Sequence, residues 1–339
     1  MMATRILLNG CILAEANGED PDEIGSKEEK GSDQVTATKN IIHVDKLRLL
    51  EIAGFTIKPL RPRLVKSDSL PTANMAPSKD PSELKKTFVD QVGEAQWDET
   101  WESIAKLSPE LFEASVDLLA VPRKKRHLSP KVQQLMSIAV DAASTHLYVP
   151  GVRKHIDAAL KEGATPAEVI EVIELTGTLG IHACNIGVPL LVEVMKEEGI
   201  YEQHPTAGKP FDERREKLKA DFTKNRGYWH TFWEDFLALD PEFFEAYLKF
   251  SSVPWLKDVD GTGKGGGALE PKVKELVYCA FDAAATHLYV PGLKLHMKNV
   301  LKYGGTPEEI MEVLEIATQL SLHTSNVAAP ILAQRLNKT

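Results

Sequence analysis

The sequence predicts an all-α protein that is built from two tandem helical repeats. The heptapeptide THLYVPG occurs twice, at residues 145–151 and 286–292, and matching residues recur around both copies. Apolar residues between the matches follow the spacing of amphipathic helices, and no useful length of sequence alternates with the period of a strand. The chain has 339 residues, which is enough for two domains with a substantial core.

Constant offsets between matching residues set the limits of the two repeats. The offset is 141 residues around the heptapeptide and 132 residues further upstream, so the second repeat carries an insertion, which falls in the glycine-rich segment 257–267. We therefore expect one domain at 84–200, a linker at 201–213 and a second domain at 214–337. Residues 1–80 form an N-terminal extension that is polar and acidic over much of its length, and we expect it to be largely disordered.

Helix signals follow one another in the same order in each repeat. Residues 98–119 have helical apolar spacing, and Ser129 followed by Pro130 begins the next helix. Pro150 and Gly151 are expected to break the chain, and a short amphipathic helix then ends at Gly163. A capping box at 165–168 opens a long helix that we expect to be interrupted near Gly180 and Pro189.

Composition excludes several classes of protein. The formal net charge of -9 argues against a nucleic-acid-binding protein, and no apolar run approaches the length that a membrane span requires. The three cysteines, Cys11, Cys184 and Cys279, provide neither a disulfide framework nor a CxxC pair, which is typical of a reducing compartment and predicts a cytoplasmic protein. The apolar stretch at the N-terminus leaves secretion or organelle targeting open.

A polar stripe runs along one face of the long helix in each repeat. Spacings of three and four residues place its members on one face. They are Glu171, Glu174, Thr178, His182 and Asn185 in the first copy, and Glu312, Glu315, Gln319, His323 and Asn326 in the second. A solvated face would explain the pattern, but such faces are typically rich in Lys and Arg, and this one has none until Lys196. We therefore interpret the stripe as part of a buried polar site.

The heptapeptide and the helix after it carry further groups that can transfer protons. These are His146, Tyr148 and His155 in the first repeat, and His287, Tyr289 and His296 in the second. Imidazole takes up and returns protons near neutral pH, while Tyr and Asn can hold a developing enolate oxygen. A structural role for each histidine is the alternative. The histidine spacing matches no familiar zinc signature, so we predict no metal.

The segment HMKNVLKYGGTPEEIMEVLEIA at 296–317, and its counterpart at 155–175, resemble the carboxymuconolactone decarboxylase family, which includes the alkylhydroperoxidase-D-like proteins. The shared order is a histidine, a glycine, Thr-Pro and Glu-Val. The resemblance implies two tandem alkylhydroperoxidase-D-like helical domains that assemble into a homo-oligomer. Aligning His155 with the histidine of the family motif places Tyr148 and Gly151 where thiol-dependent members carry two cysteines. A glutamate of some members matches Glu275 after a two-residue insertion, and Gln134 stands there in the first repeat.

The leading hypothesis is a cofactor-independent acid–base enzyme that decarboxylates, isomerises or hydrolyses a small organic acid or lactone. We assign His155 and His296 as the principal acid–base groups, assisted by His146, Tyr148, His287 and Tyr289. The substrate is expected to contact residues of the stripe, namely His182, Asn185, His323, Asn326, Glu171 and Glu312. The stripe of each repeat would complete a site formed with the other groups of the same repeat. No nucleic-acid or membrane partner is expected. The alternatives are a peroxidase-like antioxidant that uses Cys184 or Cys279, and a non-catalytic binding or scaffold protein.

Overall fold

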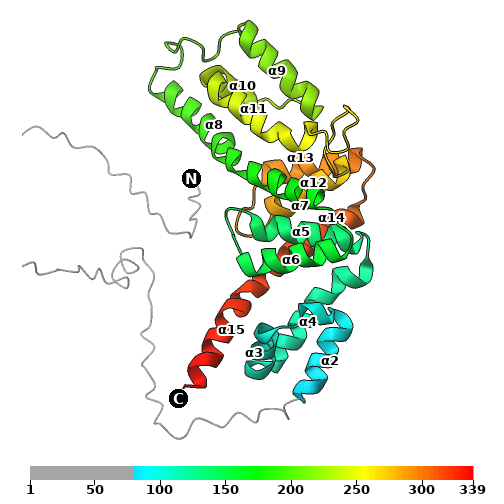
Figure 1. Cartoon of the computed structure of the whole chain (residues 1–339). Helices are drawn as coiled ribbons and strands as arrows, with labels where there is room; N and C mark the ends of the chain where they lie inside the picture. Colours follow the sequence, from blue (N-terminus) through cyan, green and yellow to red (C-terminus); the bar gives the residue numbers. More distant parts are fainter. Residues whose placement is uncertain (1–79, 339) are drawn as a thin grey trace, which may run out of the picture. The chain divides into compact units, whose positions relative to one another are not determined.

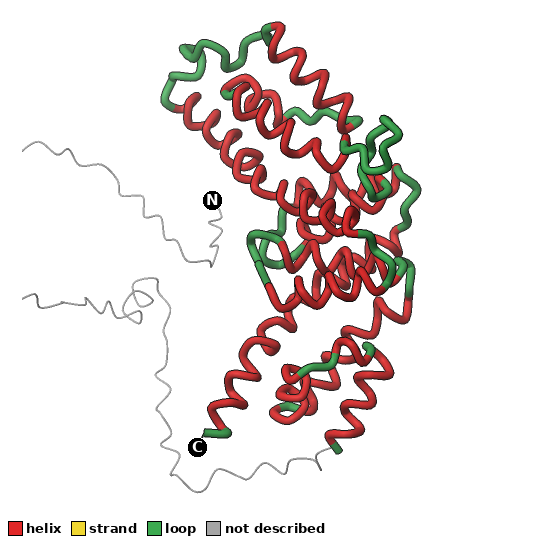
Figure 2. The backbone as a smooth tube through the Cα atoms, viewed as in Figure 1, coloured by secondary structure: helices red, strands yellow, loops and turns green. Residues whose placement is uncertain are grey.

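Every regular element in residues 80–338, the part that this computed structural model describes, is a helix (Figures 1 and 2). The predicted all-α class is therefore confirmed. The disorder expected for residues 1–80 concerns residues outside this part, apart from Asp80. The first repeat contains α2 (Pro81–Gln91), η1 (Glu94–Gln96), α3 (Glu99–Leu107), α4 (Pro109–Lys125), α5 (Pro130–Ala142), α6 (Val149–Lys161), α7 (Pro166–Thr176), η2 (Gly177–Ile181) and α8 (His182–Glu197). The second contains α9 (Glu213–Arg226), α10 (Phe232–Leu239), α11 (Pro241–Leu256), α12 (Pro271–Ala283), α13 (Val290–Lys302), α14 (Pro307–Thr318), η3 (Gln319–Leu322) and α15 (His323–Leu336).

The predicted helix starts are confirmed, and two predicted breaks are wrong. Ser129 caps α5, and Thr165 forms the capping box of α7. Gly180 lies in the 3-10 turn between α7 and α8, as expected, but Pro189 lies inside α8. Pro150 and Gly151 do not break the chain either, because they occupy the first turn of α6, where a proline lacks only an amide that would have no helical partner.

The turn between α5 and α6 is formed by the earlier residues of the heptapeptide. Leu147 adopts a left-handed conformation with φ of 51°, and the backbone amide of Tyr148 donates to the carbonyl of Asp141 at 2.9 Å. A Cβ atom on Gly151 would overlap the Asp141 carboxylate and would lie 2.6 Å from the Tyr148 ring. Glycine is therefore required here so that the aspartate and the tyrosine can both approach the start of α6. The second repeat has the same turn, with Leu288 at a φ of 52°.

The core lies where α5 of the first repeat packs against α12 of the second. Their buried apolar side chains form one cluster with residues of α7 and α14. Each of those two helices also crosses to the other repeat, since α7 packs on α12 and α14 packs on α5. The largest hydrophobic cluster is therefore shared by the two repeats, beside a smaller cluster around Phe112 in the first repeat and another around Phe244 in the second.

The last helix of each repeat packs on the other repeat. Helix α8 of the first repeat lies against α10 of the second, and α15 of the second repeat lies against α3 of the first (Figure 1). This exchange determines which side chains meet at each functional site, because α8 and α15 begin with the histidines of the polar stripe.

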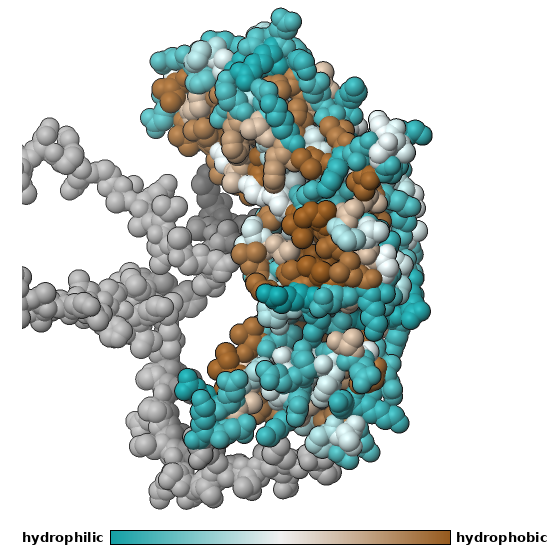
Figure 3. All heavy atoms as spheres, in the orientation of Figure 1, coloured by the Kyte–Doolittle hydropathy of each residue, from teal (hydrophilic) through white to brown (hydrophobic). Residues whose placement is uncertain are grey.

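Both exchanged helices carry apolar side chains on their outer faces. About half of each of these residues is exposed: Ile186, Leu190, Leu191 and Val194 on α8, and Val327, Ile331, Leu332 and Leu336 on α15. Figure 3 shows apolar surface over parts of both helices. Contrary to the sequence-based expectation, the stretch Pro166–Glu197 is long and apolar enough to cross a membrane by length and composition alone. Here α7 is a core helix of the shared interface.

We predict that Gly151→Ala lowers the stability of the protein. The added methyl group would overlap the Asp141 carboxylate, and overpacking of this kind costs about 1–3 kcal/mol. Gly180→Ala is the matched control, because a Cβ atom there meets no atom within 4 Å. Thermal unfolding followed by circular dichroism should show a clearly lower midpoint for Gly151→Ala alone. Equal midpoints for both variants would contradict the close approach described above.

Candidate functional site

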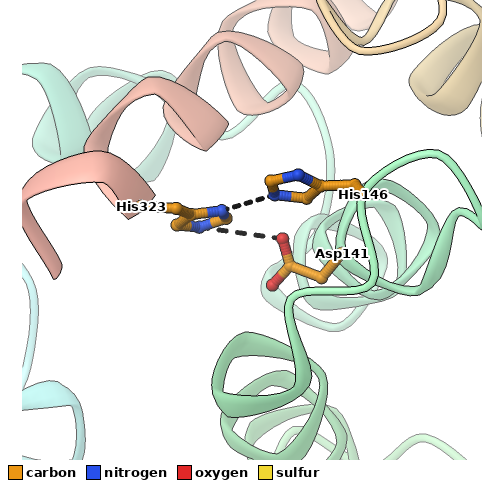
Figure 4. A group of neighbouring side chains, drawn as sticks. All are labelled: Asp141, His146 and His323. Carbon is orange, nitrogen blue, oxygen red and sulfur yellow. Dashed lines mark hydrogen bonds and ion pairs between the residues drawn. The ribbon is translucent and has the colours of Figure 1, made fainter. Parts of the chain in front are cut away.

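The first site gathers side chains of α5, the following turn and α6 around two residues of α15. The first repeat contributes Asp141, His146, Tyr148 and His155, and the second repeat contributes His323 and Asn326. Figure 4 shows Asp141, His146 and His323 pointing toward one another from these two directions.

Contacts between rings hold the first site together. His146 Nε2 and His323 Nδ1 are 2.7 Å apart, and His323 Nε2 lies 3.7 Å from Asp141 Oδ1. The Tyr148 ring stacks on the His323 ring with a centroid distance of 3.8 Å, and the side chain of Asn326 lies near the Tyr148 hydroxyl. The second repeat therefore supplies a ring and an amide that the turn of the first repeat requires.

The second site repeats this arrangement with the roles of the repeats reversed. His182 Nδ1 and His287 Nε2 are 2.6 Å apart, and His182 stacks on Tyr289 with a centroid distance of 3.7 Å. The Asn185 side chain lies near the Tyr289 hydroxyl. Here the first repeat supplies His182 and Asn185, and the second repeat supplies the turn and Asp282.

The expected grouping of the site residues within single repeats is therefore wrong. Sequence reasoning assigned His182 and Asn185 to the same site as His146 and His155, because all of them belong to one repeat. The structure places His182 and Asn185 in the second site. Offsets along the chain reveal that residues are duplicated, but they do not reveal which copies meet.

Each site has one further histidine with its own partner on the preceding helix. His155 Nδ1 lies 2.7 Å from Gln134 Oε1, and His296 Nδ1 lies 2.6 Å from Glu275 Oε2. An Nδ1–H that donates to either oxygen leaves Nε2 with the free lone pair of a base. The partner of this histidine is a neutral amide in the first site and a carboxylic acid side chain in the second. A carboxylate stabilises an imidazolium much better than an amide does.

Burial shifts the pKa values of the surrounding groups. It lowers the pKa of His182 to about 3 and that of His323 to about 4, in each case with a contribution from the histidine beside it. Burial, assisted by Arg123 and Lys154, also lowers the pKa of His155 to about 3. These three imidazoles are therefore neutral at pH 7 and are available as hydrogen-bonding groups or bases.

The buried aspartates have no hydrogen-bonding partner for several of their oxygens. Among the described residues, no hydrogen-bond donor reaches Asp141 Oδ2 or either carboxylate oxygen of Asp282. Burial raises the pKa of Asp141 to about 8 and that of Asp282 to about 7. The Oδ1 atoms of Asn185 and Asn326 are also buried without a partner in this part of the chain. Native proteins rarely leave such groups unsatisfied, so these oxygens indicate that the sites interact with something besides the protein.

A small cavity adjoins each site, and the two cavities have different linings. The cavity of the first site has a volume of about 130 Å³ and contains the charged side chains of Asp98, Arg123 and Lys154. That of the second site has a volume of about 70 Å³ and contains one guanidinium group, that of Arg226. Its other lining residues are largely aromatic and include Tyr228, Phe232, Tyr247 and Tyr278.

Two of the residues that were predicted to bind substrate lie elsewhere. Glu312 accepts hydrogen bonds from the backbone amides of His127 and Leu128, at 2.8 and 3.1 Å, just before α5. Glu171 accepts the corresponding amides of Ala268 and Leu269 before α12. Both glutamates are fully buried and line neither cavity, so the structure gives them a capping role between the repeats.

Sequence reasoning missed Asp141 and Asp282 as site residues. Asp141 recurs with Asp282 at the common offset, which was a usable signal, but its spacing of five residues from His146 does not suit a helical pair. The spacing is irrelevant because α5 ends at Ala142 and the turn brings His146 back toward the aspartate. Arg226 was also missed, since it precedes the matched heptapeptide by sixty residues.

The two cysteines in the described part of the chain do not have the setting of a redox pair. Cys279 is buried and Cys184 is partly buried, and both are free. Burial raises the pKa of both thiols, which disfavours the thiolate that redox chemistry requires. Cys11 lies outside the described residues.

The fold and the sites define a two-repeat all-α protein with histidine-centred sites that are shared between its repeats. The sequence pattern of the carboxymuconolactone decarboxylase family matches residues 109–180 and 241–329, which begin at corresponding positions of the two repeats. The chain is similar to the crystal structure of a proposed gamma-carboxymuconolactone decarboxylase subunit from Burkholderia xenovorans LB400, with 48% identity and a TM-score of 0.70. That match covers 77% of this chain and 99% of the other. No curated protein matches the sequence.

The chain therefore belongs to the carboxymuconolactone decarboxylase family, with two copies of the family domain. The thiol-dependent alkylhydroperoxidase branch is not favoured by these matches.

We predict that Glu312→Gln destabilises the fold. A glutamine at this place would turn an amide group toward the donors that now reach the carboxylate, and an unsatisfied buried donor costs about 1–3 kcal/mol. Glu308→Gln, an exposed change on the same helix, should cost less than about 0.5 kcal/mol. Urea unfolding of both variants tests the capping role. Equal stability of the two variants would argue against it.

Proposed function

We propose that the protein is an acid–base enzyme that acts on a small organic acid or lactone, with its principal base in the second site. The observation that carries this proposal is the contact between His296 and Glu275, at 2.6 Å, beside a cavity that His296 also lines. Family membership and the name of the similar Burkholderia protein support a substrate of this class.

The base is oriented by two contacts. Glu275 accepts the Nδ1–H of His296, and the Tyr278 ring stacks on the imidazole with a centroid distance of 4.2 Å. These contacts fix the ring so that Nε2 is the atom that accepts a proton from the substrate. The negative charge of Glu275 stabilises the imidazolium that forms, and the same nitrogen can then return the proton.

An anionic substrate requires a cation close to the base. Arg226 lines the same cavity, and its Nη1 donates to the Tyr278 hydroxyl at 3.1 Å. No acceptor among the described residues reaches its buried Nε. A guanidinium with a free donor is well suited to bind a carboxylate. We propose that Arg226 binds the carboxylate of the substrate.

The groups from the other repeat complete the chemistry. Proton removal next to a carbonyl or carboxylate group places negative charge on an oxygen, which must be held by hydrogen-bond donors. Tyr289 and Asn185 both line the cavity and are the donors that we assign to this oxygen. Decarboxylation, isomerisation and hydrolysis of a lactone all develop charge of this kind.

The first site is expected to be the weaker catalyst. His155 has the neutral Gln134 as its partner, and burial, assisted by Arg123 and Lys154, lowers its pKa and disfavours its protonated form. Its cavity is larger than that of the second site and is lined by more charged side chains, so we expect it to prefer different substrates. Cytoplasmic location and assembly into a homo-oligomer stay predictions, and the apolar outer faces of α8 and α15 are the surfaces where another copy would bind.

We predict that His296→Gln lowers kcat/KM by about 10²- to 10⁴-fold, because general acid–base catalysis contributes that much. The assay measures turnover of a panel of carboxylated lactones and β-keto acids by the purified protein. His155→Gln should have a smaller effect, and His127→Gln, at an exposed position, should have none. Unchanged turnover in His296→Gln, combined with loss in Cys184→Ser or Cys279→Ser, would favour thiol chemistry instead.

A second prediction tests the exchange of helices between repeats. In a His155→Gln background only the second site remains active, and His182→Ala should then lower kcat/KM by at least about 10-fold because His182 supports Tyr289. His323→Ala in the same background should leave turnover unchanged, since His323 belongs to the first site. The opposite result would mean that each site is formed within a single repeat.

A further inference from the structure

Three atoms of the second site are arranged around a common point. His182 Nδ1 lies 2.6 Å from His287 Nε2 and 3.8 Å from Asp282 Oδ1, and the latter two atoms are 4.0 Å apart. The triangle with these sides contains a point about 2.1 Å from all three atoms, and Zn–N and Zn–O bonds are about 2.0–2.2 Å long.

The carboxylate at this point has no partner of its own. Asp282 is fully buried, and no hydrogen-bond donor in the described part of the chain reaches either of its oxygens. An isolated buried carboxylate is costly unless it is paired or coordinates a cation. The carboxylate lies close against the backbone of Gly292, since a Cβ atom there would lie 2.5 Å from Asp282 Oδ2. The fold thus holds this group in place without satisfying it.

We propose that His182, His287 and Asp282 bind a divalent first-row transition-metal ion. Two imidazoles and one carboxylate form a ligand set that suits Zn²⁺, Fe²⁺ or Co²⁺ and leaves coordination positions open. Tetrahedral coordination separates adjacent nitrogen ligands to about 3.3 Å, so the two rings, now 2.6 Å apart at these nitrogens, would have to separate when the ion binds.

The lack of a familiar zinc signature in the sequence does not bear on this site, because such signatures describe ligands that are close together in one segment. The two histidine ligands are 105 residues apart and come from different repeats, so no local motif could reveal them.

The first site has the same three residue types but a different arrangement. His323 faces His146 through Nδ1 and Asp141 through Nε2, so the carboxylate and the second imidazole lie on opposite nitrogens of one ring (Figure 4). The three residues still offer one ligand atom each within 4.8 Å of one another, so this group could hold a cation too. We therefore expect one tight equivalent of metal per chain in the second site and a weaker one in the first.

A metal ion in the second site would present a Lewis acid toward the cavity. It would polarise the oxygen that we assigned to Tyr289 and Asn185, in a step where His296 moves the proton. This role rests on the proposed function, whereas the binding of the ion does not. The test below therefore measures binding alone and uses no substrate.

The experiment titrates the chelator-treated, dialysed full-length protein with Co²⁺, followed by visible absorbance, and with Zn²⁺, followed by calorimetry. We expect one tight equivalent, which His182→Ala or Asp282→Asn should weaken by more than the 10- to 100-fold that loss of an outer-shell partner typically causes. His127→Gln should bind like the wild type, because its exposed side chain lies outside both sites.

A second measurement uses the wild-type protein and does not depend on the folding of a variant. Bound Zn²⁺ should protect His182 and His287 from acylation by diethyl pyrocarbonate, as detected by peptide mass spectrometry, while the exposed His127 stays reactive. The absence of a tight Co²⁺ or Zn²⁺ equivalent, or unchanged acylation of His182 and His287 with Zn²⁺ present, would overturn the proposal. Failure of the protein to turn over any lactone or keto acid would overturn the proposed function and leave the metal site standing.

Discussion

The exchange of two buried glutamates between the repeats is the interaction on which the other contacts depend. Glu312 accepts hydrogen bonds from the backbone amides that precede α5, and Glu171 accepts them from those that precede α12. Each carboxylate satisfies backbone amides just before the helix that would otherwise be buried without a partner, and its charge favours the positive end of the helix dipole. Because each glutamate belongs to one repeat and each helix to the other, these caps fix α5 against α12. The aspartates of both sites lie at the far ends of those two helices.

Because the last helix of each repeat packs on the other repeat, neither repeat contains a complete site. Each turn needs a histidine and an asparagine from the last helix of the other repeat. In a symmetric dimer of single repeats, any change in one site would appear in the other. The joined repeats are free of this constraint, and the pair Gln134 and Glu275 shows that they have diverged at the partner of the base. Divergence extends to the cavity walls, which are charged in one site and aromatic in the other.

Local signals predicted the fold well, whereas the composition of the sites depended on contacts that leave no local signal. Caps at Ser129 and Thr165 act within one turn of the helix, so sequence alone could place them. The role of Glu171 could not be predicted in this way. Its position in a polar stripe suggested a binding site, yet its partners are backbone amides almost a hundred residues away, and every sequence offers such amides. His182 was recognised as a site residue but assigned to the wrong site for the same reason.

The duplicated heptapeptide contains residues that the sites use and that a turn between two helices does not need. A turn between two helices needs neither His287 nor Tyr289, and it does not need a leucine in the left-handed region, which usually costs about 1–2 kcal/mol. The strained residue sets the direction in which the histidine and the tyrosine beside it point, toward the partner helix. Gly292 then removes the side chain that would keep Asp282 away from them. Strain, a missing side chain and a buried carboxylate each carry a cost in stability, and in both repeats they bring these groups together.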